Sequence, residues 1–325
     1  MAASINPGGG SSASSSGSGS DEGGSTDPVV RYLQAAAELD QLPPLDGSGK
    51  IVGVACGDAF TILLDSRGRV YACGRLKGAE GKFGFAPEVR MMPYPVEVPG
   101  VRRHGPVVHV AAGYDHAVFA TASGKVLTWG VGHVGQLGRP EVTVRRRSES
   151  MLAWEAVVVP LWRKEGGRRK KVLAARVAAG GMSTFVMTRC GRVLATGLNH
   201  YNQLGTGDGS NRSAFVEVPA LSGTGVVQLV AGKSHFLALT RAGDVVVCGR
   251  GDSGQLGLGT SSSETAPVDA SLAVPRRLPR AVFGGEAVMS VIAGSNVSAA
   301  VTSSGRLFAW GFGELEQLGN GEMRD

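Results

Sequence analysis

Five glycine triplets with the same internal spacing limit what this chain can fold into more than any other feature. In each triplet the second glycine follows the first by 11 residues, and the third follows the first by 17. The triplets are Gly57/Gly68/Gly74, Gly113/Gly124/Gly130, Gly180/Gly191/Gly197, Gly232/Gly243/Gly249 and Gly294/Gly305/Gly311. Recurrence at fixed offsets indicates supersecondary units that stack on their neighbours. The sequence therefore predicts a repeat protein.

Each repeat has the pattern of a small antiparallel sheet. In the second unit, strand-like runs at 107–112, 116–121 and 125–130 are separated by turns that contain glycine. A Gln-Leu-Gly step follows in four of the five units, ending at Gly138, Gly205, Gly257 and Gly319. Glycine and alanine in the first strand suit a crowded axis on which inner strands converge. We predict an all-β fold of the β-propeller type, which fits better than a solenoid or a sandwich.

Composition agrees with many short strands joined by tight turns, since the 325 residues include 50 glycines and only 6% aromatic residues. No apolar run approaches the roughly 18 residues of a membrane span, and the N-terminus lacks the apolar stretch of a secretory signal. We expect a soluble, intracellular protein with no membrane partner.

The four cysteines show neither zinc-ligand spacing nor a redox pair. The repeat position of Cys56 is held in the other units by Ala112, Ala179, Ala231 and Ala293. Cys56 is therefore expected to be a small core residue. No constellation of a hydrolase or a metal site occurs, so we predict no cofactor, no metal and no small-molecule substrate.

Charge and composition divide the chain into three parts. Residues 1–27 are almost entirely Gly, Ser, Ala and Asp and are expected to be a disordered tail. Residues 28–49 contain one possible short helix and a linker, and residues 50–325 hold the repeats. The first 50 residues carry two basic and six acidic side chains, which leaves the repeats with a net charge of +10. A basic surface suits an acidic partner.

The repeats resemble a known family. The segments Val-x-x-Val-Ala-Ala-Gly-x-x-His and Val-x-x-Trp-Gly-x-x-x-x-Gly-Gln-Leu-Gly are similar to the repeat of the regulator of chromosome condensation family. The resemblance covers residues 50–325 and implies a seven-bladed propeller. Only five repeats are recognisable, so we expect an incomplete propeller with two exposed sheet edges and a tendency to aggregate. The family has several functions, so the fold alone does not select one.

Irregularities in the repeats resemble those of the family branch that exchanges guanine nucleotide on the small GTPase Ran. The turn at 74–84 is two residues longer than its counterparts, a basic insertion occupies 139–171, and Asn199-His200-Tyr201-Asn202-Gln203 matches that branch. The resemblance places a wedge, pressed against a Ran-type GTPase, in this insertion. Our wedge candidate is Glu141, Val142, Thr143, Val144, Arg145, Arg146, Arg147, Ser148, Glu149 and Ser150, and the alternative is a solvated loop.

Nucleotide exchange needs a protein-binding face and no covalent chemistry, because the factor acts by stabilising the nucleotide-free GTPase. The resemblance places GTPase contacts at Asp58, Asp115, His116, His235 and Asn296. Asp115 and His116 are the preferred candidates. The alternative for His116 and His235 is a strand cap that bonds within its own blade. Arg176 departs from the pattern, because the exchange factors have an acidic residue there.

The same resemblance implies association with chromatin, in a nuclear location. The tail here is acidic, so basic propeller segments would have to contact the nucleosome or serve import. The candidates are Arg168, Arg169, Lys170, Lys171, Arg212, Arg276, Arg277 and Arg280. The competing hypothesis is a non-enzymatic propeller scaffold for protein–protein interaction, which would leave a cytoplasmic location open.

Overall fold

The computed structural model describes residues 49–76, 91–140, 152–166, 168–259 and 271–321. Within these ranges the chain is built of β-strands, with two short 3₁₀ helices, η1 (Arg102–His104) and η2 (Arg280–Phe283). The predicted tail at 1–27, the helix and linker at 28–48 and the wedge candidate at 141–150 lie outside the described residues.

The strands form five antiparallel sheets in which neighbours along the chain pair with each other, as in the blades of a propeller. Blade 1 is β1 (Ile51–Cys56), β2 (Phe60–Asp65), β3 (Val70–Gly74) and β4 (Met92–Glu97). Blade 2 is β5 (Val107–Ala112), β6 (His116–Thr121), β7 (Val126–Val131) and β8 (Leu152–Val159). Blade 3 is β11 (Ala174–Ala179), β12 (Ser183–Thr188), β13 (Val193–Gly197) and β14 (Arg212–Glu217). Blade 4 is β15 (Val226–Ala231), β16 (His235–Thr240), β17 (Val245–Arg250) and β18 (Ser271–Arg277), and blade 5 is β19 (Val288–Ala293), β20 (Val297–Thr302) and β21 (Leu307–Gly311).

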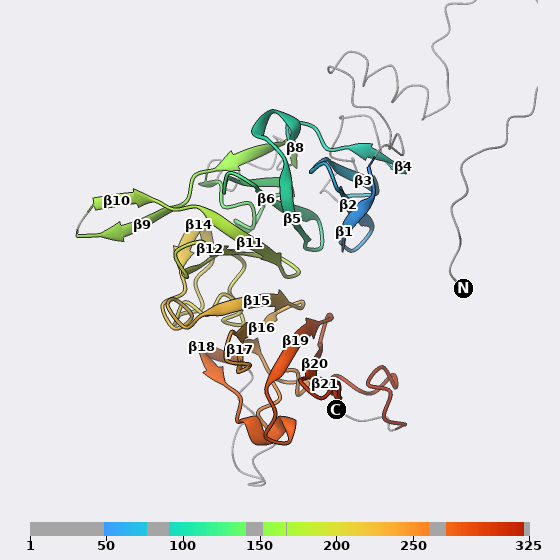
Figure 1. Cartoon of the computed structure of the whole chain (residues 1–325), viewed down its shortest axis with the longest axis vertical. Coiled ribbons are helices and arrows are strands. Elements are labelled where there is room, and N and C mark those ends of the chain that lie inside the picture. Colours follow the sequence, from blue (N-terminus) through green and yellow to red (C-terminus); the bar gives the residue numbers. More distant parts are fainter. Residues whose placement is uncertain (1–48, 77–90, 141–151, 167, 260–270, 322–325) are drawn as a thin grey trace, which may run out of the picture.

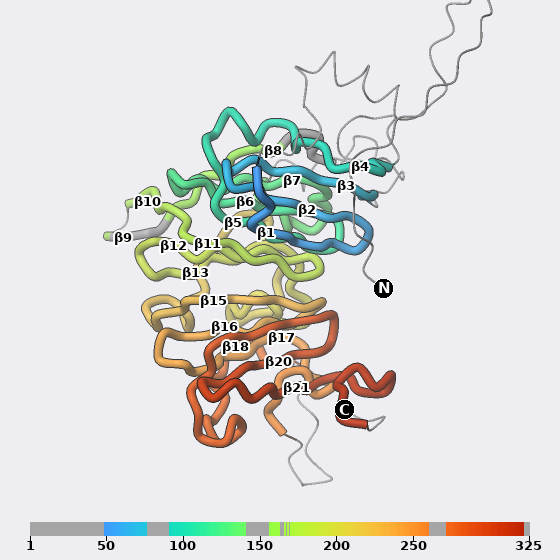
Figure 2. Tube along the Cα trace, turned by 45° about the vertical axis from the view of Figure 1, so that its right-hand side comes forward, coloured from blue at the N-terminus to red at the C-terminus, as the bar shows by residue number. Residues whose placement is uncertain are grey.

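The blades follow one another along an arc, with blades 1 and 5 at its two ends (Figures 1 and 2). The first strand of each blade is innermost, and these inner strands contact one another from blade to blade. The predicted all-β propeller is confirmed, with five blades in the described residues.

Neighbouring blades approach most closely where their first strands end. A Cβ atom built on Gly113 would lie 2.4 Å from the carbonyl oxygen of Gly180, and one on Gly180 would lie 2.7 Å from that of Gly232. A Cβ on Gly232 would lie 2.3 Å from the carbonyl oxygen of Gly294. Real Cβ atoms do not come within 3.0 Å of such atoms. At these three positions the first glycine of the triplet is required because the next blade occupies the space of a side chain, whereas at Gly57 the ring of Phe60, in the same blade, occupies it.

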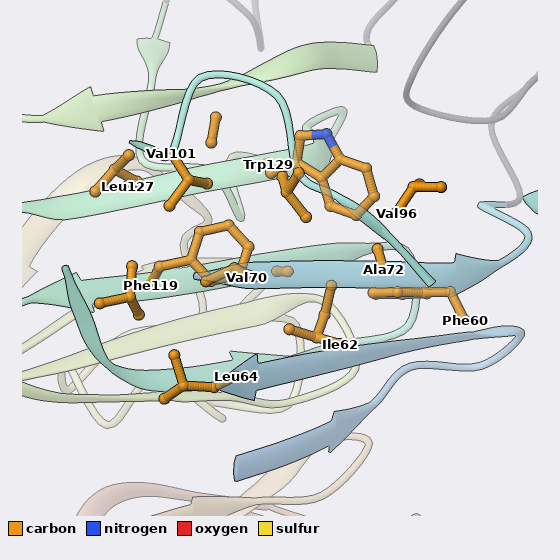
Figure 3. Packing of buried hydrophobic residues seen from close by; sticks show 14 of the residues in the cluster. Phe60, Ile62, Leu64, Val70, Ala72, Val96, Val101, Phe119, Leu127 and Trp129 are labelled. Carbon is orange, nitrogen blue, oxygen red and sulfur yellow. The ribbon is translucent and has the colours of Figure 1, made fainter. Parts of the chain in front are cut away.

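Apolar side chains fill the space between facing sheets. Between blades 1 and 2, Phe60 packs edge-on against Trp129 with ring centroids 6.1 Å apart, and both rings are buried (Figure 3). Burial of a side chain of this size stabilises the fold by roughly 2 to 3 kcal/mol. Comparable clusters fill the later interfaces, so each blade is stabilised mainly by its neighbours.

Two details differ from the sequence-based expectations. The segment 139–171 is not one insertion, because it contains β8, the fourth strand of blade 2, which pairs with β7. Cys56 is exposed rather than a core residue. It lies on the side of blade 1 that has no preceding blade among the described residues, whereas the equivalent Ala112 packs against blade 1.

The close approach between blades predicts a contrast between two glycines. Gly232→Ala should lower the free energy of unfolding by about 3 kcal/mol, because the new Cβ overlaps the Gly294 carbonyl and the blades must separate. Gly294→Ala should change it by less than about 0.5 kcal/mol, since the nearest atoms to a Cβ there lie at 3.8 Å. Urea unfolding of both variants measures the difference, and equal losses would contradict the steric explanation.

Candidate functional site

The ends of the five first strands surround a depression of about 290 Å³ on the propeller axis, which we call the axial mouth. It is lined by residues 56–58, 112–114, 179–181, 231–233 and 294–295. We call the side of the arc on which it opens the mouth side. The opposite side, where second strands turn into third strands, is the far side.

Backbone hydrogen bonds join the blades around the mouth. Asp58 N–H donates to the Tyr114 carbonyl at 3.0 Å and Tyr114 N–H to that of Gly181 at 2.9 Å. Gly181 N–H donates to Gly232 at 3.0 Å, and Lys233 N–H to Ser295 at 2.8 Å. Each bond runs from one blade to the next, so the rim of the mouth is held by backbone, and side chains there are carried on a rigid support.

Three of the predicted GTPase contacts lie on the mouth side. Asp58 is exposed, and Asp115 and Asn296 are half-buried. The turns that carry Asp115 and Asn296 are fixed, because their carbonyl groups accept from Val131 N–H at 2.8 Å and Phe312 N–H at 2.9 Å. The Asn296 side-chain oxygen has no hydrogen-bond partner among the described residues. These residues come from blades 1, 2 and 5, so the structure spreads them around the mouth.

The two predicted histidines are buried and bond across blade interfaces. His116 Nε2 lies 2.8 Å from Thr184 Oγ1, whose hydroxyl donates to the Gln136 carbonyl at 2.7 Å. In blades 4 and 5, His235 Nε2 lies 2.9 Å from Ser298 Oγ, which donates to the Gln255 carbonyl at 2.7 Å. The alternative prediction, a strand cap that bonds within a single blade, is wrong, because each side-chain hydroxyl partner belongs to the following blade.

A group that the sequence-based reasoning missed also lies on the mouth side, in loops that follow third strands. The Arg250 guanidinium lies 4.8 Å from the ring centroid of Tyr201, and Tyr201 is 40% exposed. Arg250 Nε also donates to Asp252 Oδ1 at 2.7 Å. Its hydrogen bonds lower the pKa of the Asp252 carboxyl. A fixed arginine beside an exposed aromatic ring is a frequent element of protein interfaces. The only sequence signal is the Asn-His-Tyr-Asn-Gln step.

The wedge candidate Glu141–Ser150 lies outside the described residues, but the strands that flank it do not. Val131, at the end of β7, pairs with Leu152, at the start of β8, and Val131 N–H donates to the Asp115 carbonyl. The chain therefore leaves blade 2 and re-enters it on the mouth side, next to Asp115.

The other half of the segment 139–171 lies on the far side. Since β8 is antiparallel to β7, it ends there, and the chain continues into a hairpin of β9 (Trp162–Glu165) and β10 (Arg168–Lys171). The hairpin projects from the edge of the arc (Figure 1). Arg168, Lys170 and Lys171 are exposed on it, and of Arg169 only the backbone pairing with Lys164 is described.

The remaining basic candidates do not form one cluster. Arg277 and Arg280 converge on the buried carboxylate of Asp244 on the far side, at 3.1 and 2.8 Å, and Arg276 is exposed beside them. Arg212 begins β14 on the mouth side and pairs with Asp208 at 2.6 Å. The structure thus places Arg212 on the opposite side from the other candidates.

Within the described ranges, no group of three or more His, Cys, Asp or Glu side chains is arranged to hold a metal ion. None of the helices in the described part of the chain has the length and apolar character needed to cross a membrane.

The blade arrangement and the repeated His-to-hydroxyl joints define a β-propeller of the repeat class that the sequence resembles. The family model described as RCC1-like domain matches residues 14–325. The chain belongs to this family.

Named relatives agree with this assignment. The chain is 34% identical over 283 residues to "Regulator of chromosome condensation" of Homo sapiens, covering 85% of this chain and 63% of the relative. It is 31% identical over 317 residues to "Guanine nucleotide exchange factor SRM1" of Saccharomyces cerevisiae, covering 95% and 62%. It is also 30% identical over 277 residues to the E3 ubiquitin-protein ligase HERC2 of Homo sapiens, covering 84% and 5%.

Among solved structures, the chain resembles Prp20p of Saccharomyces cerevisiae, described with its binding properties to Gsp1p and histones. The TM-score is 0.71 at 28% identity, over 86% of this chain and 62% of that one. The chain therefore spans somewhat less than two thirds of the relatives it matches most fully.

The buried histidines predict a loss of stability in mild acid. Burial lowers the pKa of His116 and of His235 to about 4. The unfolded chain, with a histidine pKa of about 6.5, then binds more protons than the folded chain between these values. Their contribution is fully present above about pH 6.5 and is lost as the pH falls toward 4.

A double variant isolates this effect. His116→Gln with His235→Gln should reduce the drop in unfolding free energy between pH 7 and pH 5, because glutamine does not titrate there. Denaturant unfolding at both pH values measures it. His200→Gln, at an exposed position, is the control and should keep the full drop. An unchanged drop in the double variant would show that other groups cause it.

Proposed function

We propose that this protein is a guanine nucleotide exchange factor for a Ran-type small GTPase and that the GTPase binds on the mouth side. The observation that carries the proposal is that Asp58 lines the axial mouth and that Asp115 and Asn296 directly follow residues that line it, on turns fixed by backbone bonds. Similarity to "Guanine nucleotide exchange factor SRM1" at 31% identity supports it.

In this proposal, exchange results from a difference in the affinity of the protein for two states of the GTPase. The protein binds the nucleotide-free GTPase more tightly than the loaded one, and by linkage this weakens the hold of the GTPase on its nucleotide. A fixed surface favours this, since little ordering entropy is lost on association. Asp58, Asp115 and Asn296 make direct contacts, and the buried His116 and His235 act indirectly by holding adjacent blades in register.

The wedge belongs to the same proposal. We assign the wedge role to Glu141–Ser150, because the flanking strand β7 ends and the flanking strand β8 begins beside the Asp115 turn. This position supports the assignment of the wedge to the first part of the segment 139–171, and not to the hairpin of β9 and β10 on the far side.

We assign a second surface, on the far side, to chromatin. The hairpin residues Arg168, Lys170 and Lys171, and Arg276 in blade 4, present exposed positive charge on this side, which suits phosphate groups or an acidic histone surface. Arg212 is assigned to neither role, since it is paired on the mouth side. A nuclear location follows from this assignment.

Asp115→Ala tests the GTPase contact. It should slow the release of labelled GDP from a Ran-type GTPase about tenfold, the equivalent of ~1.4 kcal/mol of lost interaction. The melting temperature should stay within about 2 °C. Glu286→Ala, a far-side carboxylate paired with Arg306, is the control and should leave release unchanged.

Two outcomes would count against the proposal. A large drop in melting temperature for Asp115→Ala would reassign this residue to structure. If the unmodified protein bound the GTPase without accelerating GDP release, a non-enzymatic scaffold would be the better description, a role for which the fold is equally suited.

A further inference from the structure

We propose that the far-side turn of blade 2 holds a binding site for a phosphate group, formed by Ser123, Lys125 and His104. The turn joins β6 to β7, and His104 belongs to η1, in the linker that leads into blade 2. The ligand is either free inorganic phosphate or the phosphoserine side chain of a partner protein. The site lies opposite the axial mouth, so this inference is independent of the proposed exchange activity.

The equivalent turn of blade 5 binds a carboxylate that the protein itself supplies. Glu286, in the linker before β19, accepts from Ser304 Oγ and from Arg306 Nη2, both at 2.6 Å. Hydrogen bonds from Ser304, Thr302 and Arg306 lower the pKa of the Glu286 carboxyl to about 2. A serine hydroxyl and a cation on this turn therefore form a site for negatively charged oxygen atoms.

The turn of blade 2 carries the same donors. Ser123 and Lys125 occupy the repeat positions of Ser304 and Arg306. In both turns the serine hydroxyl lies against the hydroxyl of the threonine two residues earlier, at 3.0 Å in blade 2 and 3.2 Å in blade 5. The hydroxyl and the cation are thus presented from the same kind of turn.

The linker of blade 2 meets its turn as in blade 5 but supplies no carboxylate. Ala122 N–H donates to the Pro106 carbonyl at 2.8 Å, and the equivalent bond in blade 5 measures 2.9 Å. The residue before the accepting one is Glu286 in blade 5 and Gly105 in blade 2. Blade 2 therefore keeps the donors of the site without the acidic side chain that occupies it in blade 5.

No other acid of blade 2 takes its place. In three blades the residue at the position of Lys125 is an arginine paired with a carboxylate, and these pairs are Arg69–Asp65 at 2.7 Å, Arg192–Glu217 at 2.6 Å and Arg306–Glu286 at 2.6 Å. The positions of the three carboxylates are held in blade 2 by Thr121, Val158 and Gly105. Lys125 forms no ion pair within the described ranges, so its ammonium group can bind an external anion.

His104 favours phosphate over a carboxylate as the ligand. Burial lowers the pKa of His104, and so do the nearby charges of Arg103 and Lys125. The ring therefore lies in a positive field beside Lys125, and in its neutral form it still donates one N–H. The equivalent linker residue in blade 5 is Gly285, which has no side chain. A phosphate group has more charge and one more acceptor oxygen than a carboxylate, which suits the additional donor.

Calorimetric titration of the full chain with inorganic phosphate, at constant ionic strength in chloride, tests the site. Phosphate should bind saturably. Lys125→Gln should weaken binding at least about tenfold, because a charge-assisted hydrogen bond is lost. His104→Glu should abolish binding, since the new carboxylate pairs with Lys125 in place of the ligand.

Arg192→Gln is the matched control. It removes a cation at the same repeat position that is already paired with Glu217, and it should leave the affinity for phosphate unchanged. Every variant should melt within about 3 °C of the unmodified chain, which shows that it is folded.

A phosphoserine peptide and its unphosphorylated form identify the source of the phosphate group. Displacement of phosphate by the phosphorylated peptide alone would assign the site to a partner protein, and displacement by neither peptide would assign it to the free anion. Either result supports the site. The proposal would be overturned if phosphate did not bind saturably, if Lys125→Gln left binding unchanged, or if Arg192→Gln weakened it equally. Duplex DNA that bound through Lys125 without competition from phosphate would also overturn it, because the turn would then belong to an extended nucleic-acid surface.

Discussion

At three of the four joints between blades the first glycine of one repeat lies against a carbonyl group of the next, and this close contact is the constraint on which the rest of the structure depends. It sets the distance between inner strands, which in turn lets N–H groups bond from blade to blade around the axial mouth. Apolar packing between sheets supplies most of the stabilisation but is tolerant of sequence. A backbone contact that leaves no room for a side chain tolerates only glycine. It therefore determines which residue recurs at this position of the repeat.

Asp115 and His116 are adjacent in sequence but have different surroundings at the start of β6. Asp115 is half-buried in a turn on the mouth side, whereas His116, one position later, enters the interface with blade 3 and is fully buried. The alternation of side chains along an extended chain produces this division. A substitution at His116 would alter the mouth by loosening two blades, and one at Asp115 would alter its charge alone.

The blades could be predicted from sequence because glycine spacing and alternating strands are local signals. Other features depend on contacts between distant residues. The partner of His116 is Thr184, 68 positions away, and no local pattern identifies it. The strand β8 falls within the predicted insertion because it lacks a glycine marker and pairs with β7 residues that are distant in the sequence. The prediction for Cys56 is wrong because the burial of this position depends on a neighbouring sheet, and none precedes blade 1 among the described residues.

The direction of β8 bears on whether the proposed GTPase and chromatin surfaces could bind their partners at the same time. This strand begins beside the Asp115 turn and ends near the β9–β10 hairpin. The two surfaces are therefore separated by the length of the strand. Neither occupant would exclude the other sterically. If the two proposed partners bind, simultaneous occupancy with nearly independent affinities is the expected behaviour, because the two surfaces share no residue.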